Sequence, residues 1–312
     1  MAVRVSCPHC QTPCLIADQH LKVPVQCARC GKAFTMQAPA AAPSRSAVHG
    51  PRLDVGSATS AGRIRSRNED SLLVQHLAWT TLDGLHEIAL LAIADGMGGH
   101  EAGHEASCLV VQTLSAVLTP LLAGVQSVEL SGVTTQDMFT RQVNNALKEA
   151  NRTVYQQGQS NPAKKGMGAA AALALVWDDH ALIGHVGDCR VYLQRSGTLT
   201  QLTQDHTLVA RMVQLGQLTP KEAANHPRKN ELTQAIGKNA DVKPDLNHLQ
   251  LFPGDWLVLA SDGLHADLEE RALQLEMGRP APTSTECARR LVDLANDKGG
   301  SDNCSVIAVA YR

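Results

Sequence analysis

Three aspartates in this sequence share one local pattern, because each lies close to glycine at the edge of a short apolar run. Asp95 and Asp262 end such runs, and Asp302 lies just ahead of the run at 305–311. A carboxylate at the end of a buried strand is costly unless a basic side chain or a metal ion neutralises it. Because three such positions are hard to explain as turn residues alone, we expect the three carboxylates to bind metal together.

A fourth aspartate, Asp188, lies in a Gly-Asp turn between two apolar runs. An ordinary hairpin turn explains this residue equally well when it is considered alone. Sites built only from oxygen ligands favour hard cations, Mg²⁺ or Mn²⁺, over Zn²⁺. Such ions keep several bound waters, and a bound water can become a nucleophile.

Charged residues of both signs lie close together between positions 63 and 70. Three arginines, Arg63, Arg65 and Arg67, precede Glu69 and Asp70. A solvated charged loop is one explanation of this cluster. The other is a phosphate clamp beside a metal site, since the guanidinium group binds phosphate with two parallel hydrogen bonds. Together with the aspartates, the cluster predicts metal-assisted attack of water on a phosphate ester.

Apolar runs and segments of helical periodicity alternate around these residues. Runs bounded by turn residues predict strands at 53–60, 72–76, 87–94, 170–177, on both sides of the turn within 181–193, within 255–264 and at 305–311. Helical spacing and capping residues predict helices at 102–120, 136–157, 208–215, from 219 onward and at 285–297. We expect residues 203–238 to form a surface flap that borders the site.

The first 36 residues carry two CxxC pairs, Cys7 with Cys10 and Cys27 with Cys30. Four thiolates at this spacing are typical of a tetrahedral, structural Zn²⁺ site. A segment this short also needs such a link to fold, because it cannot bury enough apolar surface. A disulfide pair or unligated thiols are the alternative, and a neighbouring cysteine or histidine could replace one ligand.

Composition sets the domain boundaries and limits the function classes. Residues 37–50 contain Pro, Ala and Ser without apolar periodicity, which predicts a flexible linker between a zinc ribbon at 1–36 and one large domain at 51–312. The net charge of −2 argues against general binding to nucleic acid or anionic membranes. No apolar run approaches the ~20 residues of a membrane span, so we expect a cytoplasmic protein.

Residues 53–312 resemble the bacterial branch of the metal-dependent PPM (PP2C-type) serine/threonine protein phosphatases. The matching motifs occur in the family's order at 65–70, 94–99, 166–168, 186–190, 202–206, 261–264 and 300–303. The resemblance implies hydrolysis of phosphoserine and phosphothreonine on proteins by a water that bridges two Mn²⁺ or Mg²⁺ ions. It also implies an α+β fold, a four-layer αββα sandwich in which helices flank two antiparallel sheets, here preceded by the zinc ribbon.

The resemblance assigns the first group of metal ligands. Asp95 would bridge the two ions, and the carbonyl group of Gly96 would join one of them. Asp262 and Asp302 would hold the first ion. These four residues occupy the family's motif positions in this sequence.

The remaining roles that the resemblance implies concern the second ion, the substrate and a third ion. Glu69 and Asp70 would serve the second ion, mainly through water, and Arg65 would bind the substrate phosphate. Asp188 would hold the weaker third ion of bacterial members. Met97 stands where eukaryotic members carry a histidine proposed as general acid, so the leaving group would take its proton from another source.

The resemblance implies phosphoprotein substrates and a cognate Ser/Thr kinase as partners, and we expect a monomer that binds neither membranes nor nucleic acid. A catalytically weak signalling or binding module is the first alternative, but no metal-binding aspartate is missing. A nucleic-acid protein acting through the zinc ribbon is the second. Lys22, Arg29 and Lys32 give the ribbon a small basic patch, although the overall charge disfavours this function. A docking or regulatory role is the one we expect for the ribbon.

Overall fold

In the computed structural model of the chain, residues 2–6, 13–17, 25–34, 52–81, 84–124, 134–266, 268 and 270–312 are described. The chain divides into two compact units, of which the larger comprises Gly50–Thr81 and Leu85–Arg312 and the smaller contains Met1–His49. The smaller unit holds two antiparallel pairs of strands. They are β1 (Ala2–Ser6) with β2 (Pro13–Ala17), and β3 (Val25–Gln26) with β4 (Ala33–Phe34).

The larger unit is built on two antiparallel sheets, as the family resemblance implies, and each sheet has five strands. The first sheet has the order β11-β10-β13-β14-β5 and consists of β5 (Leu53–Ser60), β10 (Arg190–Arg195), β11 (Thr198–Gln201), β13 (Trp256–Ala260) and β14 (Cys304–Tyr311). The second has the order β12-β9-β8-β7-β6 and consists of β6 (Asp70–Thr81), β7 (Gly84–Met97), β8 (Gly168–Trp177), β9 (His180–Val186) and β12 (Asp245–Gln250).

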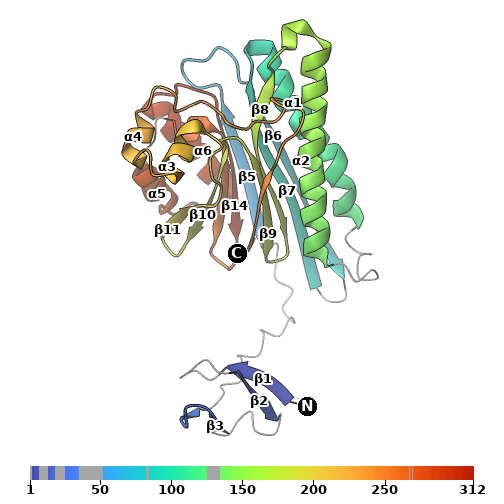
Figure 1. The fold of residues 1–312 in the computed structure, drawn as a ribbon, viewed down its shortest axis with the longest axis vertical. Coiled ribbons are helices and arrows are strands. Elements are labelled where there is room, and N and C mark those ends of the chain that lie inside the picture. Colours follow the sequence, from blue (N-terminus) through green and yellow to red (C-terminus); the bar gives the residue numbers. More distant parts are fainter. Residues whose placement is uncertain are drawn as a thin grey trace. The chain divides into compact units, whose positions relative to one another are not determined.

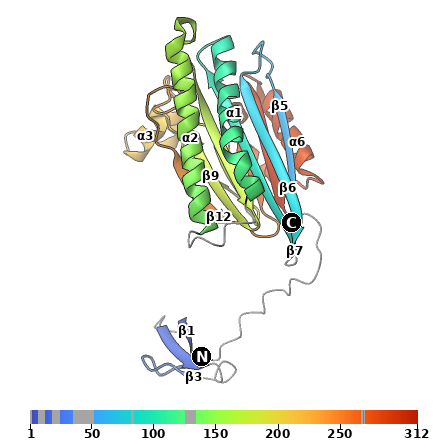
Figure 2. The ribbon, with the colours of Figure 1, turned by 90° about the vertical axis from the view of Figure 1, so that its right-hand side faces the viewer.

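Helices cover the outer face of each sheet, which gives a four-layer αββα arrangement. The long helices α1 (His100–Gly124) and α2 (Thr135–Ser160) pack on the second sheet, while α5 (Glu270–Met277) and α6 (Ser284–Lys298) pack on the first. Figure 1 shows the two helix pairs on opposite sides of the sheets. Figure 2, after a quarter turn, shows α1 and α2 lying across the sheet that contains β9.

Both faces of the central strands are buried, which explains the unbroken apolar runs in the sequence. Along β7, alternate residues belong to two core layers. The layer under α1 and α2 receives Ile88, Leu90, Ala92 and Ala94, and the layer between the sheets receives Ala89, Leu91 and Ile93. Because successive side chains of a strand point to opposite faces, Asp95 continues the second series and is directed between the sheets.

Helix α1 differs from the sequence-based expectation in two ways. Its segment Glu101–Leu122 is long and apolar enough to cross a membrane by length and composition, although we expected no such segment. One helix of this kind is weak support for a membrane span, because the core helix of a soluble domain passes the same test. A stripe at helical spacing is buried against the second sheet and comprises Ala102, Ala106, Val110, Leu114, Leu118 and Leu122.

The second difference concerns the end of α1. The sequence predicted an end at Pro120, but the helix continues to Gly124. Proline removes one helical hydrogen bond and usually ends or kinks a helix. Here Leu118 and Leu122 are both buried on the core side. The burial of these two leucines on either side of the proline offsets the lost hydrogen bond.

Capping residues start helices where the sequence predicts them. Thr134 Oγ1 accepts a hydrogen bond from the main-chain N–H of Asp137 at the start of α2. In the flap segment, which contains α3 (Leu208–Gln214) and α4 (Pro220–Ala224), Thr219 and Glu222 form both bonds of a capping box. Two short 3₁₀ helices, η3 (Pro162–Lys164) and η4 (Asp262–Leu264), complete the described elements of the larger unit.

Among the described strands and α-helices of the larger unit, three have no predicted counterpart: β11, β12 and α5. β12 reads Asp-Leu-Asn-His-Leu-Gln and lies at the edge of its sheet, where only part of its surface is buried. β6 also extends well beyond the predicted 72–76. Edge strands exposed on one side carry few apolar residues, so hydrophobic runs do not identify them.

Candidate metal centre

The predicted metal-binding aspartates meet because the strand ends that carry them lie at one end of the sandwich, called here the aspartate end. Antiparallel pairing places the end of β7 beside the start of β8, with Met97 opposite Gly168. It likewise places the end of β13 beside the start of β14, with Ala260 opposite Val306. The connection from β9 to β10 crosses between the two sheets at the same end. It contains Asp188.

The charges of these carboxylates raise one another's pKa. Desolvation raises the pKa of Asp95 well above its usual range, and the charges of Asp262, Asp70 and Asp188 raise it further. Desolvation, followed by the charge of Asp262, raises the pKa of Asp188 to about 8. Burial raises the pKa of Asp70 to about 7, with the charges of Asp262 and Asp302 acting in the same direction. Five carboxylates therefore share one electrostatic environment.

Within the described residues, two buried oxygen atoms of this cluster lack a hydrogen-bond donor. Oδ1 of Asp70 and Oδ1 of Asp262 are buried and receive no hydrogen bond in the described part of the chain. A buried carboxylate oxygen without a donor is costly, and a cation removes that cost. Because the donors are all oxygen atoms, the cluster fits a hard cation such as Mg²⁺ or Mn²⁺.

Glu69 and Gly96 lie together against the first turn of α1. If Gly103 carried a Cβ atom, this atom would lie 2.0 Å from Glu69 Oε2 and 3.1 Å from the carbonyl oxygen of Gly96. A Cβ atom on Gly96 would lie 2.1 Å from the carbonyl oxygen of Gly103. The two glycines therefore let the end of β7 approach the helix closely. The Glu69 carboxylate and the Gly96 carbonyl oxygen therefore both lie next to Gly103. Oxygen atoms that bind a common cation must lie close together in this way.

Arg65 reaches the cluster from the loop that follows β5. Its Nη2 atom donates a hydrogen bond to Asp302 Oδ2 at 2.7 Å. Its charge also lowers the pKa of Asp262, in opposition to the larger effect of desolvation. The side chain remains 53% exposed, so the guanidinium group is accessible from solvent as a phosphate-binding group must be.

Sequence reasoning did not identify the buried Asn303 as a residue that holds this loop. Its Nδ2 atom donates to the carbonyl oxygens of Ala61 (3.0 Å) and Arg67 (2.8 Å), and its Oδ1 accepts from the N–H of Glu69 (2.8 Å). These three bonds fix both ends of the loop that carries Arg65. A polar side chain directly after Asp302 was the available signal.

Ser261 and Ser305 were also missed, and they orient Asp70. Ser261 Oγ donates a hydrogen bond to Asp70 Oδ2 at 2.7 Å and accepts one from the N–H of Ser305 at 2.9 Å. Hydrogen bonds from both serines lower the pKa of Asp70 in opposition to burial. The hydrogen bond from Ser261 to Oδ2 thus also holds the unpaired Oδ1 of Asp70 in place.

A second candidate metal site, predicted from four cysteines, lies only partly within the described residues. Cys7 and Cys10 lie outside them. Cys27 is buried and Cys30 half-buried in the tight turn between β3 and β4. In this turn the N–H of Cys27 donates to the carbonyl of Lys32 at 3.0 Å, and that of Gly31 to the carbonyl of Cys27 at 2.9 Å.

Comparison with known proteins identifies the family of this chain. Residues 61–295 match the family model described as protein phosphatase 2C. The protein phosphatase PhpP of Streptococcus pneumoniae is 33% identical over 260 residues, which cover 83% of this chain and 98% of PhpP.

Solved structures agree with this match. The serine/threonine phosphatase PstP/Ppp of Mycobacterium tuberculosis superimposes with a TM-score of 0.69 and 31% identity, covering 83% of this chain and 99% of that one. The catalytic domain of a phosphatase named PstP, solved with two manganese ions, gives a TM-score of 0.66 and 31% identity, with 83% and 97% covered. The chain belongs to the protein phosphatase 2C family.

Proposed function

We propose that this chain hydrolyses phosphoserine and phosphothreonine in proteins with the help of two Mn²⁺ or Mg²⁺ ions. Protein phosphatase activity is what its family membership and its relatives indicate. The observation that carries the metal dependence is the buried carboxylate cluster with its two unpaired oxygens, on Asp70 and Asp262. The manganese ions in the PstP catalytic domain support the choice of cation.

The residues that would hold the two ions are Asp95, Asp262, Asp302, Glu69, Asp70 and the carbonyl group of Gly96. When bound, such ions lower the pKa of a water molecule and neutralise the phosphoryl oxygens. Arg65 would orient the phosphate, and to do so it would exchange its hydrogen bond with Asp302 for bonds to the substrate. Met97 has no exchangeable proton, so the leaving oxygen takes its proton from another group.

A third ion beside Asp188 forms part of the proposal. Support comes from the raised pKa of Asp188, which the charge of Asp262 increases beyond the effect of burial. Arg190, two residues further on, lowers this pKa, but its guanidinium is engaged in a bidentate pair with Asp205 at 2.9 and 2.7 Å. A cation would therefore relieve the remaining repulsion between Asp188 and its neighbours.

We further propose that Cys7, Cys10, Cys27 and Cys30 bind a structural Zn²⁺ ion. The tight turn after Cys27, with Gly31 at φ +68°, is the backbone geometry that lets both thiolates of a CxxC pair face one ion. The zinc content of the purified chain, measured by mass spectrometry, should be close to one per molecule and should fall in Cys27→Ser. An unchanged zinc content in that variant would contradict the assignment.

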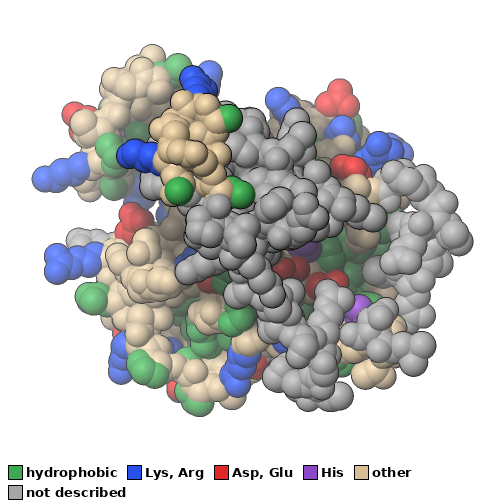
Figure 3. Space-filling view, turned by 90° about the horizontal axis from the view of Figure 1, so that it is seen from below, with side chains coloured by type: hydrophobic (Ala, Val, Ile, Leu, Met, Phe, Trp, Pro, Cys, Tyr) green, Lys and Arg blue, Asp and Glu red, His purple; other side chains and the backbone are tan. Residues whose placement is uncertain are grey.

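Phosphoproteins and a cognate Ser/Thr kinase are the proposed partners of a monomeric, cytoplasmic enzyme. On the face drawn in Figure 3, the visible Lys and Arg side chains are interspersed with Asp and Glu. The net charge of −2 disfavours the nucleic-acid alternative. A catalytically weak module is also disfavoured, because the structure brings the predicted carboxylates together instead of dispersing them.

The decisive experiment is an assay of the full-length chain on a phosphothreonine peptide. Hydrolysis should require Mn²⁺ or Mg²⁺, cease on chelation and be lost in Asp95→Asn. The asparagine has the same shape as the aspartate but lacks the charge that would hold two cations. Undiminished hydrolysis by the variant, or by the chelated protein, would contradict the proposal.

A further inference from the structure

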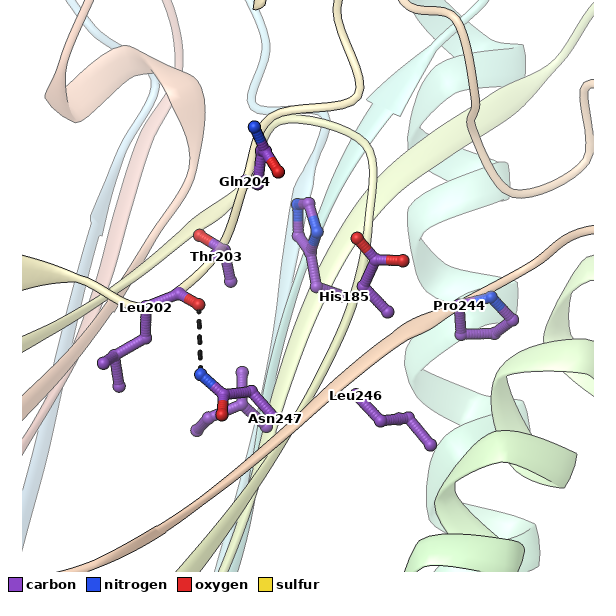
Figure 4. Close-up of a pocket in the computed structure, with 9 residues that line it drawn as sticks. His185, Leu202, Thr203, Gln204, Pro244, Leu246 and Asn247 are labelled. Carbon is purple, nitrogen blue, oxygen red and sulfur yellow. Dashed lines mark hydrogen bonds between the residues drawn. The ribbon is translucent and has the colours of Figure 1, made fainter. Parts of the chain in front are cut away.

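Three polar side chains meet close to the turn that carries Asp188: His185 of β9, His206 and Asp245 of β12. One ligand atom from each lies within 4.8 Å of the other two. His185 is 1% exposed, and both of its ring nitrogens lack a hydrogen-bond partner in the described residues. His185 and Asp245 line a cavity of about 270 Å³, and Figure 4 shows His185 among the residues around it. By distance alone, the three groups could bind a metal ion.

Hydrogen bonds around His206 determine which of its ring nitrogens carries the proton. The N–H of Gly187 donates to Nδ1 of His206 at 3.1 Å, and Nε2 of Gln234 lies 2.9 Å from the same atom. The main chain of Lys243 fixes the amide of Gln234, because its N–H donates to Oε1 at 3.0 Å and its carbonyl accepts from Nε2 at 2.9 Å. Both groups facing Nδ1 are therefore donors, and Nδ1 is an acceptor.

The proton of the neutral imidazole must then lie on Nε2, which is 3.1 Å from Asp245 Oδ2 and donates to it. A histidine that binds a metal almost always donates its other ring N–H to a carboxylate, a carbonyl or water. His206 has the opposite arrangement, because its other nitrogen receives two N–H groups. The hydrogen-bond pattern thus argues against a metal ion between His206 and Asp245.

The same bonds hold the turn that precedes Asp188. Gly187 donates its N–H to His206 Nδ1, and its carbonyl accepts the N–H of His206 at 2.7 Å. Gly187 has φ +105°, and a Cβ atom there would lie 2.4 Å from Cβ of Ala170, so the turn is pressed against β8. The carbonyl oxygen of His206 accepts a hydrogen bond from the N–H of Thr233 at 2.8 Å. Thr233 lies at the far end of the flap segment.

We infer that His206 is a positioning residue, which holds the Gly187–Asp188 turn in the orientation that presents the Asp188 carboxylate to a cation. Asp245 and Gln234 fix the ring by holding its two nitrogens. The inference rests on the proposed function, because it concerns the ion assigned to Asp188. It predicts that the affinity for that ion depends on the acceptor at Nδ1 of His206.

Two substitutions of His206 test the roles of its two ring nitrogens separately. In His206→Asn the side-chain oxygen can take the place of Nδ1 and accept from Gly187, but nothing reaches Asp245. In His206→Gln the terminal amide can take the place of Nε2 and donate to Asp245, but Gly187 loses its acceptor. Asp245→Ala removes the acceptor for the N–H of His206 Nε2, and Asp245→Asn keeps an acceptor oxygen there. This second pair of variants provides the test if His206→Gln does not fold.

The measurement is Mn²⁺ binding to the full-length protein, read from the electron paramagnetic resonance signal of free Mn²⁺, with Asp188→Ala as the reference that lacks the weak ion. His206→Gln should weaken that ion about 10- to 100-fold, as loss of a second-layer contact typically does, and should leave the tighter ions unchanged. His206→Asn should restore most of the affinity. Asp245→Ala should weaken the ion less than His206→Gln, and Asp245→Asn should match the wild type.

Several results would overturn the inference. They are a wild-type affinity in His206→Gln, an equal loss in both His206 variants, or no ion that depends on Asp188. Binding of an additional Zn²⁺ that Asp245→Ala abolishes would show that the three side chains form a metal site instead. Because the binding measurement needs no turnover, it decides the role of His206 even if the wild-type protein fails to hydrolyse phosphopeptides.

Discussion

The two ends of the β-sandwich both bury carboxylates, but the hydrogen-bond partners of these carboxylates differ between the ends. At the end opposite the aspartate end, called here the paired end, Asp255 is 3% exposed. Its oxygens accept from Arg195 Nε (2.9 Å) and Nη2 (2.6 Å) and from the N–H of Phe252 (2.8 Å). Glu87, also buried there, accepts from His76 Nε2 at 2.9 Å and from the main-chain N–H groups of Arg52 and Leu53.

At the aspartate end, by contrast, the buried Oδ1 atoms of Asp70 and Asp262 have no donor within the described residues. A buried carboxylate with donors on both oxygens is compensated for its burial, whereas a cluster of carboxylates in which some oxygens lack donors destabilises the fold until a cation binds. Such unpaired, mutually repelling groups are typical of functional sites. The comparison therefore separates a structural end of the molecule from a functional one.

The largest contrast should come from Asp262→Asn at the aspartate end. Turnover of a phosphothreonine peptide should fall by more than about 100-fold, because even indirect metal contacts are worth about 10- to 100-fold. In chelator, the same variant should be more stable than the wild type, by about 0.5–2 kcal/mol, since one repelling charge is gone. Steady-state kinetics and urea unfolding measure the two effects. If Asp262→Asn were active and less stable than the wild type, the assignment of the aspartate end as the functional end would be wrong.

Arg195→Met at the paired end should have the opposite profile. Asp255 would be left as a buried charge with only the N–H of Phe252, which costs about 3 kcal/mol of unfolding free energy. Methionine keeps an unbranched apolar stem, but it loses the stacking of the guanidinium group on Phe252, where Cζ of Arg195 lies 4.6 Å from the ring centroid. The activity of the folded fraction should be unchanged, which Mn²⁺-saturated kinetics well below the melting temperature will test. A large loss of kcat with normal stability would show that this end also serves catalysis.

The pH dependence of stability sharpens the comparison further. The native pKa values of Asp70 and Asp188, about 7 and about 8, lie above the unfolded value near 3.8. The native state therefore binds these protons more tightly, and the stability of the metal-free protein should rise as pH falls from 8 to 6.5, by about 2 kcal/mol. The buried His185 and His265, whose pKa values are lowered from 6.5 to about 4 and about 3, act in the opposite direction as pH approaches 6.5. They reduce the net gain in stability over this range to about 1.5 kcal/mol.

Thermal melts in chelator and in saturating Mn²⁺ measure this difference. With Mn²⁺ the dependence on pH between 6.5 and 8 should shrink or reverse, because cations hold the carboxylates ionised. A metal-free protein that is more stable at pH 8 than at pH 6.5 would contradict the assignment of the repelling cluster.

The smallest effect is expected for Arg65→Lys. The lysine keeps the charge but cannot bind phosphate with two parallel hydrogen bonds, so kcat/KM should fall about tenfold, equivalent to about 1.4 kcal/mol. Stability should change by less than about 0.5 kcal/mol, because the ion pair with Asp302 is half-exposed. Kinetics on phosphopeptide and urea unfolding provide the test. Arg63→Lys is the matched control, since Arg63 pairs with Asp297 on the surface.

Much of the fold followed from local patterns. The central strands β7, β8 and β14 each contain a long apolar run because both faces of that run are buried. Helix starts such as Thr134 and Thr219 carry their own capping side chains. The elements that were missed or misplaced depend on neighbours. β12 is a polar edge strand, and α1 passes through Pro120 because Leu118 and Leu122 are buried in the core.

The sequence by itself predicted the aspartates as metal ligands, because a carboxylate beside a glycine at the end of an apolar strand is energetically costly wherever that strand is buried. Only the tertiary structure decided which of these carboxylates remain unpaired. Asp255, which begins an apolar strand, looks similar in the sequence but is paired with Arg195, 60 residues away. Asn303 and His206 likewise acquire their roles from partners on other segments. Hydrogen bonds between distant segments depend on strand register and loop path, which local composition does not encode.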